Sequence, residues 1–189
     1  MGISNANKER SASRIDCGGS FKIKLSLTAE PNIVTNPADI VLLLDRSRSM
    51  AGSPLANLKK GAETFIDILD EATDGALDGK IGHGSRIGIV SFADTATKDT
   101  PLTATVSTLK QAVHALTSGG STNHADAFTK ALELFDPASA NAKVMVLFTD
   151  GRTTAGGNAS PIAAAAKAQG VVIYCRRCIN ACQKFLKTA

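Results

Sequence analysis

The chain has 189 residues, of which 43% are hydrophobic and 4% aromatic, and its net charge is +4. This length suits one domain with a single core, and the composition excludes a disordered or fibrous chain. The scarcity of aromatic residues and the lack of a recognition motif argue against a nucleic-acid partner.

The beginning of the chain divides into two segments. Residues 1–20 are polar and without periodicity, which predicts a flexible N-terminus. Apolar and polar residues then alternate in FKIKLSLTAE, which predicts a half-buried strand within an N-terminal strand and turn over residues 21–36. We expect the main domain to occupy residues 37–189.

An alternation of strands and helices follows. The run DIVLLL, residues 39–44, is apolar at consecutive positions, which is typical of a strand covered on both faces in a parallel sheet. A helix is expected next, with Ser53 as its N-cap and Pro54 at its first position. Residues 86–93 predict a second strand, and residues 95–102 a short edge strand or hairpin arm.

The second half of the chain continues this order. Helices are expected over residues 106–120, where glycines end the helix, and over residues 123–137. Residues 143–150 predict a third buried strand, residues 160–170 a helix and residues 171–175 a fourth strand. This alternation predicts an α/β fold with a doubly wound, mainly parallel central sheet flanked by helices.

Hard oxygen donors follow three of these elements. The first buried strand leads into Asp45, Ser47 and Ser49, the loop before the 123–137 helix contains Thr122, and the third buried strand leads into Asp150. Ligands of doubly wound sheets bind beyond the carboxyl ends of the strands. Two carboxylates there repel each other unless a cation lies between them or one is protonated. Hydroxyl and carboxylate ligands favour Mg²⁺, Mn²⁺ or Ca²⁺ over zinc.

The motifs DRSRSM, GGSTN and FTDG, in this order, resemble the von Willebrand factor type A domain with its metal-ion-dependent adhesion site. That family's pattern is Asp-x-Ser-x-Ser, then a loop threonine, then a strand-end aspartate. The resemblance covers roughly residues 38–175 and implies a metal site made of Asp45, Ser47, Ser49, Thr122 and Asp150. It also implies a protein-binding module, not an enzyme, that presents Mg²⁺ with one open position to an Asp or Glu of a protein partner, as in cell adhesion.

Two features depart from the family pattern. Family members continue after the VVIYC strand with another helix, a final strand and a last helix, so we expect this domain to lack the last strand and helix. Arg48 stands where the family commonly has glycine. A β-carbon there is costly if the residue needs a positive φ. Its charge would weaken metal binding by Coulomb repulsion but attract an acidic partner.

The alternative from another class is a Mg²⁺-dependent hydrolase or phosphoesterase that uses the same strand-end site, with Ser47 as a nucleophile. A nucleophilic serine needs a base, and His83 and His114 are poorly placed in the sequence. His124 is nearest, two residues beyond Thr122, and we interpret it as a helix-start residue that packs or hydrogen-bonds locally. The sequence has no nucleophile elbow, zinc-protease motif or P-loop.

The cysteines and the apolar runs bear on the compartment. Cys175, Cys178 and Cys182 form a C-x₂-C-x₃-C run that would ligate zinc or an iron-sulfur cluster only with Cys17 as a fourth ligand; reduced, packed thiols are the simpler expectation. With no secretory signal and no apolar run long enough to cross a bilayer, we expect a cytoplasmic chain without membrane insertion, with surface association left open.

Overall fold

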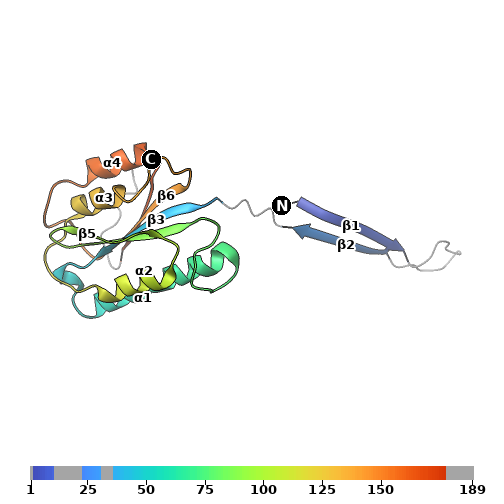
Figure 1. The fold of residues 1–189 in the computed structure, drawn as a ribbon, viewed down its shortest axis with the longest axis horizontal. Helices are drawn as coiled ribbons and strands as arrows, with labels where there is room; N and C mark the ends of the chain where they lie inside the picture. Colours follow the sequence, from blue (N-terminus) through green and yellow to red (C-terminus); the bar gives the residue numbers. More distant parts are fainter. Residues whose placement is uncertain (1, 11–22, 31–35, 178–189) are drawn as a thin grey trace. The chain divides into compact units, whose positions relative to one another are not determined.

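The computed structural model describes residues 2–10, 23–30 and 36–177, and the chain divides into one unit over residues 1–35 and another over residues 36–189. In the first unit, β1 (Gly2–Arg10) pairs antiparallel with β2 (Ile23–Glu30), as Figure 1 shows. The N-terminus expected to be flexible therefore contains a strand. The sequence pattern misses β1 because ladder hydrogen bonds come from the backbone and form without apolar alternation.

The second unit is built on a five-stranded sheet with the order β5-β4-β3-β6-β7. β3 is central and pairs in parallel with β4 and β6, β7 pairs in parallel with β6, and β5 pairs antiparallel with β4. The predicted mainly parallel α/β sheet is confirmed. The strands are β3 (Ala38–Asp45), β4 (Arg86–Phe92), β5 (Ala96–Thr103), β6 (Ala142–Thr149) and β7 (Val172–Arg177).

Helices cover both faces of this sheet, with α1 and α2 on one side and α3 and α4 on the other (Figure 1). Among the residues described, no helix combines the length and apolar character needed to cross a membrane. The helical elements are the 3₁₀ turn η1 (Arg48–Met50), α1 (Ser53–Asp74), α2 (Val106–Ala115), α3 (His124–Leu132) and α4 (Ser160–Ala168).

Several helix ends differ from the expected ones. Gly52, not Ser53, is the N-cap of α1, and Ser53 is its first residue. Helix α2 ends at Ala115, before the glycines, because Leu116 already has extended backbone angles (φ −60°, ψ 135°). Helix α3 begins where expected because the Asn123 side chain accepts a hydrogen bond from the backbone N–H of Asp126 at 3.1 Å.

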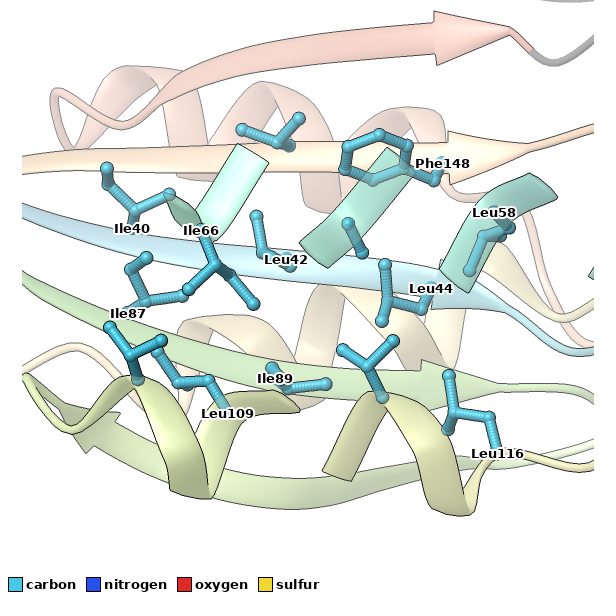
Figure 2. Packing of buried hydrophobic residues seen from close by; sticks show 14 of the residues in the cluster. Ile40, Leu42, Leu44, Leu58, Ile66, Ile87, Ile89, Leu109, Leu116 and Phe148 are labelled. Carbon is cyan, nitrogen blue, oxygen red and sulfur yellow. The ribbon is translucent and has the colours of Figure 1, made fainter. Parts of the chain in front are cut away.

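The core consists of two apolar clusters, one on each face of the sheet. β3 supplies both, since Leu42 and Leu44 face α1 and α2 while Val41 and Leu43 face α3 and α4, and all four are fully buried. Figure 2 shows the first cluster, in which side chains of β3 and β4 meet those of the two helices. Burial on both faces explains why this strand reads as an unbroken apolar run.

A buried carboxylate marks the beginning of β3. Asp39 is fully buried and accepts two hydrogen bonds from the guanidinium of Arg86, at 2.9 and 2.7 Å. Ser139 and Asn141 also donate to it, at 3.1 and 3.0 Å. Burial by itself raises the pKa of Asp39, but the hydrogen bonds from Arg86, Asn141 and Ser139 and the charge of Arg86 outweigh it, so the pKa is lowered overall. Asp39 thereby ties the beginning of β3 to the beginning of β4 and to the loop before β6.

Replacing Arg86 with methionine should lower the free energy of unfolding by about 2 kcal/mol at pH 7, because Asp39 loses its cationic partner. A cost below the roughly 3 to 5 kcal/mol of a fully buried pair is expected, since the Arg86 side chain is 39% exposed and solvent screens the pair. Urea denaturation at several pH values measures the effect.

The pH dependence of this stability difference tests whether the Asp39–Arg86 pair is its cause. In the native protein the pKa of Asp39 is lowered, so its stabilisation is complete above the unfolded pKa of about 4 and is lost as the pH falls through the folded value. The difference between the native protein and the Arg86→Met variant should therefore shrink below about pH 4. A matched control is Lys98→Met, which removes the exposed pair with Glu133 and should cost much less than the Arg86 change, because solvent screens that pair. A difference that is constant with pH would contradict the prediction.

Candidate metal site

Three loops meet at the carboxyl edge of the sheet. We name them the β3 loop (residues 46–52), the α3 loop (residues 116–123) and the β6 loop (residues 150–159). The β3 loop and the α3 loop exchange backbone hydrogen bonds: Arg48 donates to the carbonyl of Gly120 at 2.9 Å, and Gly119 donates to the carbonyl of Arg46 at 2.8 Å. The two loops are thus held against each other by their main chains.

The α3 loop is bonded equally closely to the β6 loop. The backbone N–H of Thr122 donates to the hydroxyl of Thr154 at 2.9 Å, and the carbonyl of Thr122 accepts from Thr154 and Ala155 at 2.9 and 3.1 Å. These contacts join segments about thirty residues apart at the position of Thr122. These hydrogen bonds join the three loops into one rim.

Gly120 is required by this arrangement. Its φ is +77°, and an added β-carbon would collide with the carboxylate of Asp94. That carboxylate accepts the backbone N–H of Ser121 at 2.9 Å. Hydrogen bonds from the Ser121 backbone and side chain, with the charges of Arg48 and Arg46, lower the pKa of Asp94. An ionised aspartate therefore supports the turn that leads into Thr122.

Asp45 ends β3 as a fully buried carboxylate. One of its oxygens accepts the backbone N–H of Ser47 at 2.9 Å, and the other accepts the hydroxyl of Thr149 at 2.5 Å. Within the described part of the chain, no lysine or arginine forms an ion pair with Asp45. A buried carboxylate held only by neutral donors has capacity for a cation beside it.

The hydroxyls expected to bind metal lie together. The Oγ atoms of Ser47 and Ser49 are 3.1 Å apart, and Ser49 donates to Oδ1 of Asp150 at 3.0 Å. Thr122 is buried at 4% exposure, and its hydroxyl has no hydrogen-bond partner among the residues with described side chains. A cavity of about 380 Å³ adjoins these hydroxyls, lined by Ser47, Arg48, Ser49, Asp94, Gly120, Ser121, Thr122 and Thr154.

This donor set is compatible with a hard cation. In the structurally described residues, no three His, Cys, Asp or Glu side chains gather in a way that suits a metal ion. The site instead combines the carboxylates of Asp45 and Asp150 with three hydroxyls, and all five donors are oxygens. Oxygen ligands are typical of Mg²⁺, Mn²⁺ and Ca²⁺.

Beneath Asp45 lies a polar chain that the sequence reasoning missed. Thr149, which donates to Asp45, lies 3.4 Å from Nε2 of His124, and Nδ1 of the same imidazole is 2.7 Å from the hydroxyl of Thr153. Because the Thr149 proton is directed at Asp45, the arrangement fits a proton on Nε2 that His124 donates to Thr149. The one sequence signal was a threonine at the end of an apolar strand, inside the FTDG motif.

The structure confirms the local role expected for His124. The side chain is 2% exposed and packs edge-on against Phe92, with ring centroids 5.4 Å apart. Burial lowers its pKa more than the nearby charge of Asp45 raises it, so the imidazole is neutral at pH 7. Its nitrogens face Thr149 and Thr153, while the Ser47 hydroxyl faces Ser49. No histidine is thus in position to activate Ser47 in the described structure.

Arg48 does not strain the β3 loop. It is the first residue of η1, and among the described non-glycine residues only His83 has a positive φ. A β-carbon at position 48 is therefore accommodated without the cost anticipated for a left-handed backbone. The Arg48 side chain is exposed and lines the cavity, where its charge contributes to the lowered pKa of Asp94.

The expectation of reduced cysteines is wrong for Cys175, which is disulfide-bonded. Disulfides form where two cysteine Cα atoms approach within roughly 4.4 to 6.8 Å, a distance that sequence spacing does not reveal. Cys17, Cys178 and Cys182 lie outside the described residues, and so does any zinc or iron-sulfur site that would need them.

Comparison with known proteins supports the fold and the family. The family model described as "von Willebrand factor type A domain" matches residues 39–187. Human matrilin-3 is 30% identical over 152 residues, which cover 74% of this chain and 29% of matrilin-3. The chain spans less than a third of the length of the curated relatives it matches.

Two solved structures show the same architecture. A von Willebrand factor type A protein from Catenulispora acidiphila superposes with a TM-score of 0.62 at 21% identity, covering 82% of this chain and 35% of that one. Proximal thread matrix protein 1 from the mussel byssus, "with zinc occupied MIDAS motif", superposes with a TM-score of 0.61 at 26% identity, covering 74% of this chain and 35% of that one.

Replacing Thr149 with valine should lower the free energy of unfolding by about 1 to 3 kcal/mol in the presence of chelator, because an oxygen of the buried Asp45 loses its hydroxyl donor. Urea denaturation followed by circular dichroism measures the loss.

Thr64→Val is the matched control for this change. The Thr64 hydroxyl bonds the carbonyl of Lys60 on an exposed stretch of α1, so its loss should change stability by less than about 0.5 kcal/mol. Equal effects at positions 149 and 64 would contradict a supporting role for Thr149.

Proposed function

The chain belongs to the von Willebrand factor type A domain family, and we propose that it is a metal-dependent protein-binding module of the adhesion or matrix type. Its metal site consists of Asp45, Ser47, Ser49, Thr122 and Asp150. Its protein partner supplies an Asp or Glu carboxylate to the metal. The observation that carries the proposal is the position of these donors around one rim, with Asp45 buried and, among the residues that the structure describes, hydrogen-bonded only by neutral groups.

The hydroxyl and carboxylate residues would contribute to cation binding in different ways. The hydroxyls of Ser47, Ser49 and Thr122 adjoin the cavity and are suited to direct coordination. Asp45 and Asp150 supply negative charge, either directly or through water that they orient. A cation held mainly by neutral hydroxyls keeps enough charge to attract a carboxylate from outside. The chain's own contribution is to hold these groups in place before the metal arrives.

The identity of the bound metal is part of this proposal. The all-oxygen donor set favours Mg²⁺, with Mn²⁺ and Ca²⁺ as further candidates. The mussel relative carries zinc at its motif, which is a property of that protein. Parallel titrations with Mg²⁺, Mn²⁺, Ca²⁺ and Zn²⁺ rank the metals for this chain.

Arg48 gives the rim a local preference for acidic groups. Its exposed side chain lines the cavity beside the hydroxyls, and it belongs to the turn that contains Ser47 and Ser49. A fixed positive charge there repels a metal ion and attracts a carboxylate. Asp94, on the same cavity and ionised at neutral pH, partly offsets the repulsion. Metal and acidic partner should therefore bind better together than separately.

Thr122→Ala should weaken Mn²⁺ binding about tenfold or more, because the Thr122 hydroxyl, which no described side chain engages, would be a direct ligand. Ser121→Ala is the matched control: Ser121 lines the same cavity one position earlier but is outside the proposed ligand set. Its effect should stay below about twofold. Calorimetric titration measures both, and equal affinities for the two variants would contradict the ligand assignment.

Arg48→Gly should strengthen Mn²⁺ binding in the same titration, because the repulsive charge is removed, and the gain should diminish as salt is raised. Asp45→Ala should abolish binding and serves as the negative reference. Weaker metal binding by the glycine variant would show that Arg48 organises the rim instead of opposing the metal.

Partner binding is tested by affinity capture with the full chain on beads. Proteins retained with Mg²⁺ and released by chelator are expected, and the Thr122→Ala chain should fail to retain them while the Ser121→Ala chain retains them. A Mg²⁺-dependent turnover of phosphoesters by the same protein would instead favour the hydrolase alternative.

A further inference from the structure

A row of polar side chains connects the β6 loop to Asp45 through the start of α3 and the end of β6. It consists of Thr153, His124, Thr149 and Asp45, in that order, and we name it the Asp45 relay. His124 is the first residue of α3 and Thr149 the last of β6, and both are 2% exposed. Only Asp45 belongs to the proposed ligand set, so the other three members have no assigned function.

The Thr149 hydroxyl is the central group of the relay. A hydroxyl has one proton to donate and two lone pairs that accept. Its proton is directed at Oδ2 of Asp45, which is 2.5 Å away and belongs to a carboxylate, whereas the carbonyl of Gly151 is 3.5 Å away. One lone pair accepts the backbone N–H of Gly151 at 3.2 Å. The second lone pair is available to Nε2 of His124, at 3.4 Å, and matches a proton on that nitrogen.

The second ring nitrogen of His124 sets the direction of the whole relay. Nδ1 lies 2.7 Å from the hydroxyl of Thr153. With the proton on Nε2, Nδ1 is an acceptor, and Thr153 is the group that donates to it. Every proton in the relay then points toward Asp45. In the other tautomer, Nε2 would be an acceptor and would compete with Asp45 for the single proton of Thr149.

The same hydroxyl also acts on the second carboxylate of the site. Gly151 directly follows Asp150, so the hydrogen bond from its N–H to Thr149 holds the turn that contains Asp150. If the Thr149 hydroxyl turned away, its lone pair would face Oδ2 of Asp45 at the same short distance, and the two acceptors would repel each other. The direction of one proton therefore affects the positions of both carboxylates.

We propose that His124 and Thr153 are positioning residues of the metal site, which keep the Thr149 hydroxyl directed at Asp45 and thereby set the spacing of Asp45 and Asp150. This inference rests on the proposed function, because it assigns a role toward the cation that those carboxylates would hold. Neither His124 nor Thr153 would contact the cation. Residues that orient metal ligands from behind typically change metal affinity about tenfold or more when they are replaced.

The experiment must separate this role from packing, because the His124 ring also contacts Phe92, with centroids 5.4 Å apart. His124→Phe keeps an aromatic ring of similar volume and removes both ring nitrogens. His124→Gln restores a donor, since its amide nitrogen is about as far from the backbone as Nε2 is. A packing role predicts that phenylalanine is the better replacement, and a positioning role predicts that glutamine is.

The tautomer is tested first, in chelator and without any metal. Long-range ¹⁵N–¹H NMR spectra of the full chain distinguish a proton on Nε2 from one on Nδ1. The chain has three histidines, and the signals that His124→Phe removes belong to His124. We expect the proton on Nε2. A proton on Nδ1 would overturn the proposal, because Thr149 would then have to donate to His124.

Metal binding is tested by calorimetric titration of Mn²⁺ into chains that circular dichroism shows to be folded. His124→Phe should weaken binding about fivefold, less than the loss of a residue in direct contact with a ligand, and His124→Gln should stay within about twofold of the native chain. The matched control is His114→Phe. His114 is 68% exposed and pairs with Glu63 of α1, on the other face of the sheet, so its replacement should leave the affinity unchanged. Native affinity in the His124→Phe chain would overturn the proposal.

A double-mutant cycle with Thr149→Val tests whether His124 acts through Thr149. Once the hydroxyl is absent, His124→Phe has nothing left to orient, so the double variant should bind Mn²⁺ as Thr149→Val does. The same cycle on the free energy of unfolding in chelator should also be non-additive, and it needs no metal binding to be measured. Additive effects in both cycles would assign His124 to packing and overturn the proposal.

The titration of the native chain separates this proposal from the one on which it rests. Absence of Mn²⁺ binding by the native chain would contradict the proposed function, and the positioning role would be overturned with it. Mn²⁺ binding by the native chain together with additive cycles, or with the proton on Nδ1, would overturn the positioning role alone and leave the proposed ligand set intact.

Discussion

The burial of β3 on both faces is the constraint on which the rest of this domain depends. With strands on either side and helices above and below, β3 is buried from Asp39 to Asp45. After the apolar run Ile40–Leu44, the next polar side chain therefore lies at the carboxyl edge of the sheet, where the loops that follow the neighbouring parallel strands begin. The position of the site follows from the pairing of the strand, and its chemistry follows from the residues that come next.

Hydrogen bonds within the protein join the loops that form the rim of the site. Hydrogen bonds join the β3 loop to the α3 loop, and the α3 loop to the β6 loop at Thr122. Thr149 and His124 fix Asp45 from below. Protein hydrogen bonds of this kind reduce the ordering that a bound cation would otherwise have to impose.

The parts of this structure that were predictable from sequence are those governed by local pattern. β3, β4 and β6 are continuous apolar runs, and α3 begins at a recognisable cap, Asn123. The donor residues followed from their positions at strand ends. By contrast, β1 is a polar sequence paired through its backbone, and the early end of α2 depends on one residue's extended conformation. The contact between Thr149 and Asp45 joins residues 104 positions apart, a proximity that only the folded chain creates.

The two ends of β3 hold carboxylates in unlike surroundings: Arg86 neutralises Asp39, whereas in the described parts of the chain Asp45 accepts hydrogen bonds from neutral donors only. Between them the strand is entirely apolar. If β3 slid by two residues against β4 and β6, one of these charges would enter the apolar interior and the other would leave its partners, at a cost of several kcal/mol. The two aspartates therefore favour the native alignment of β3 with β4 and β6 over a shifted one. Only in that alignment does the loop that contains Ser47 and Ser49 begin at the carboxyl edge of the sheet.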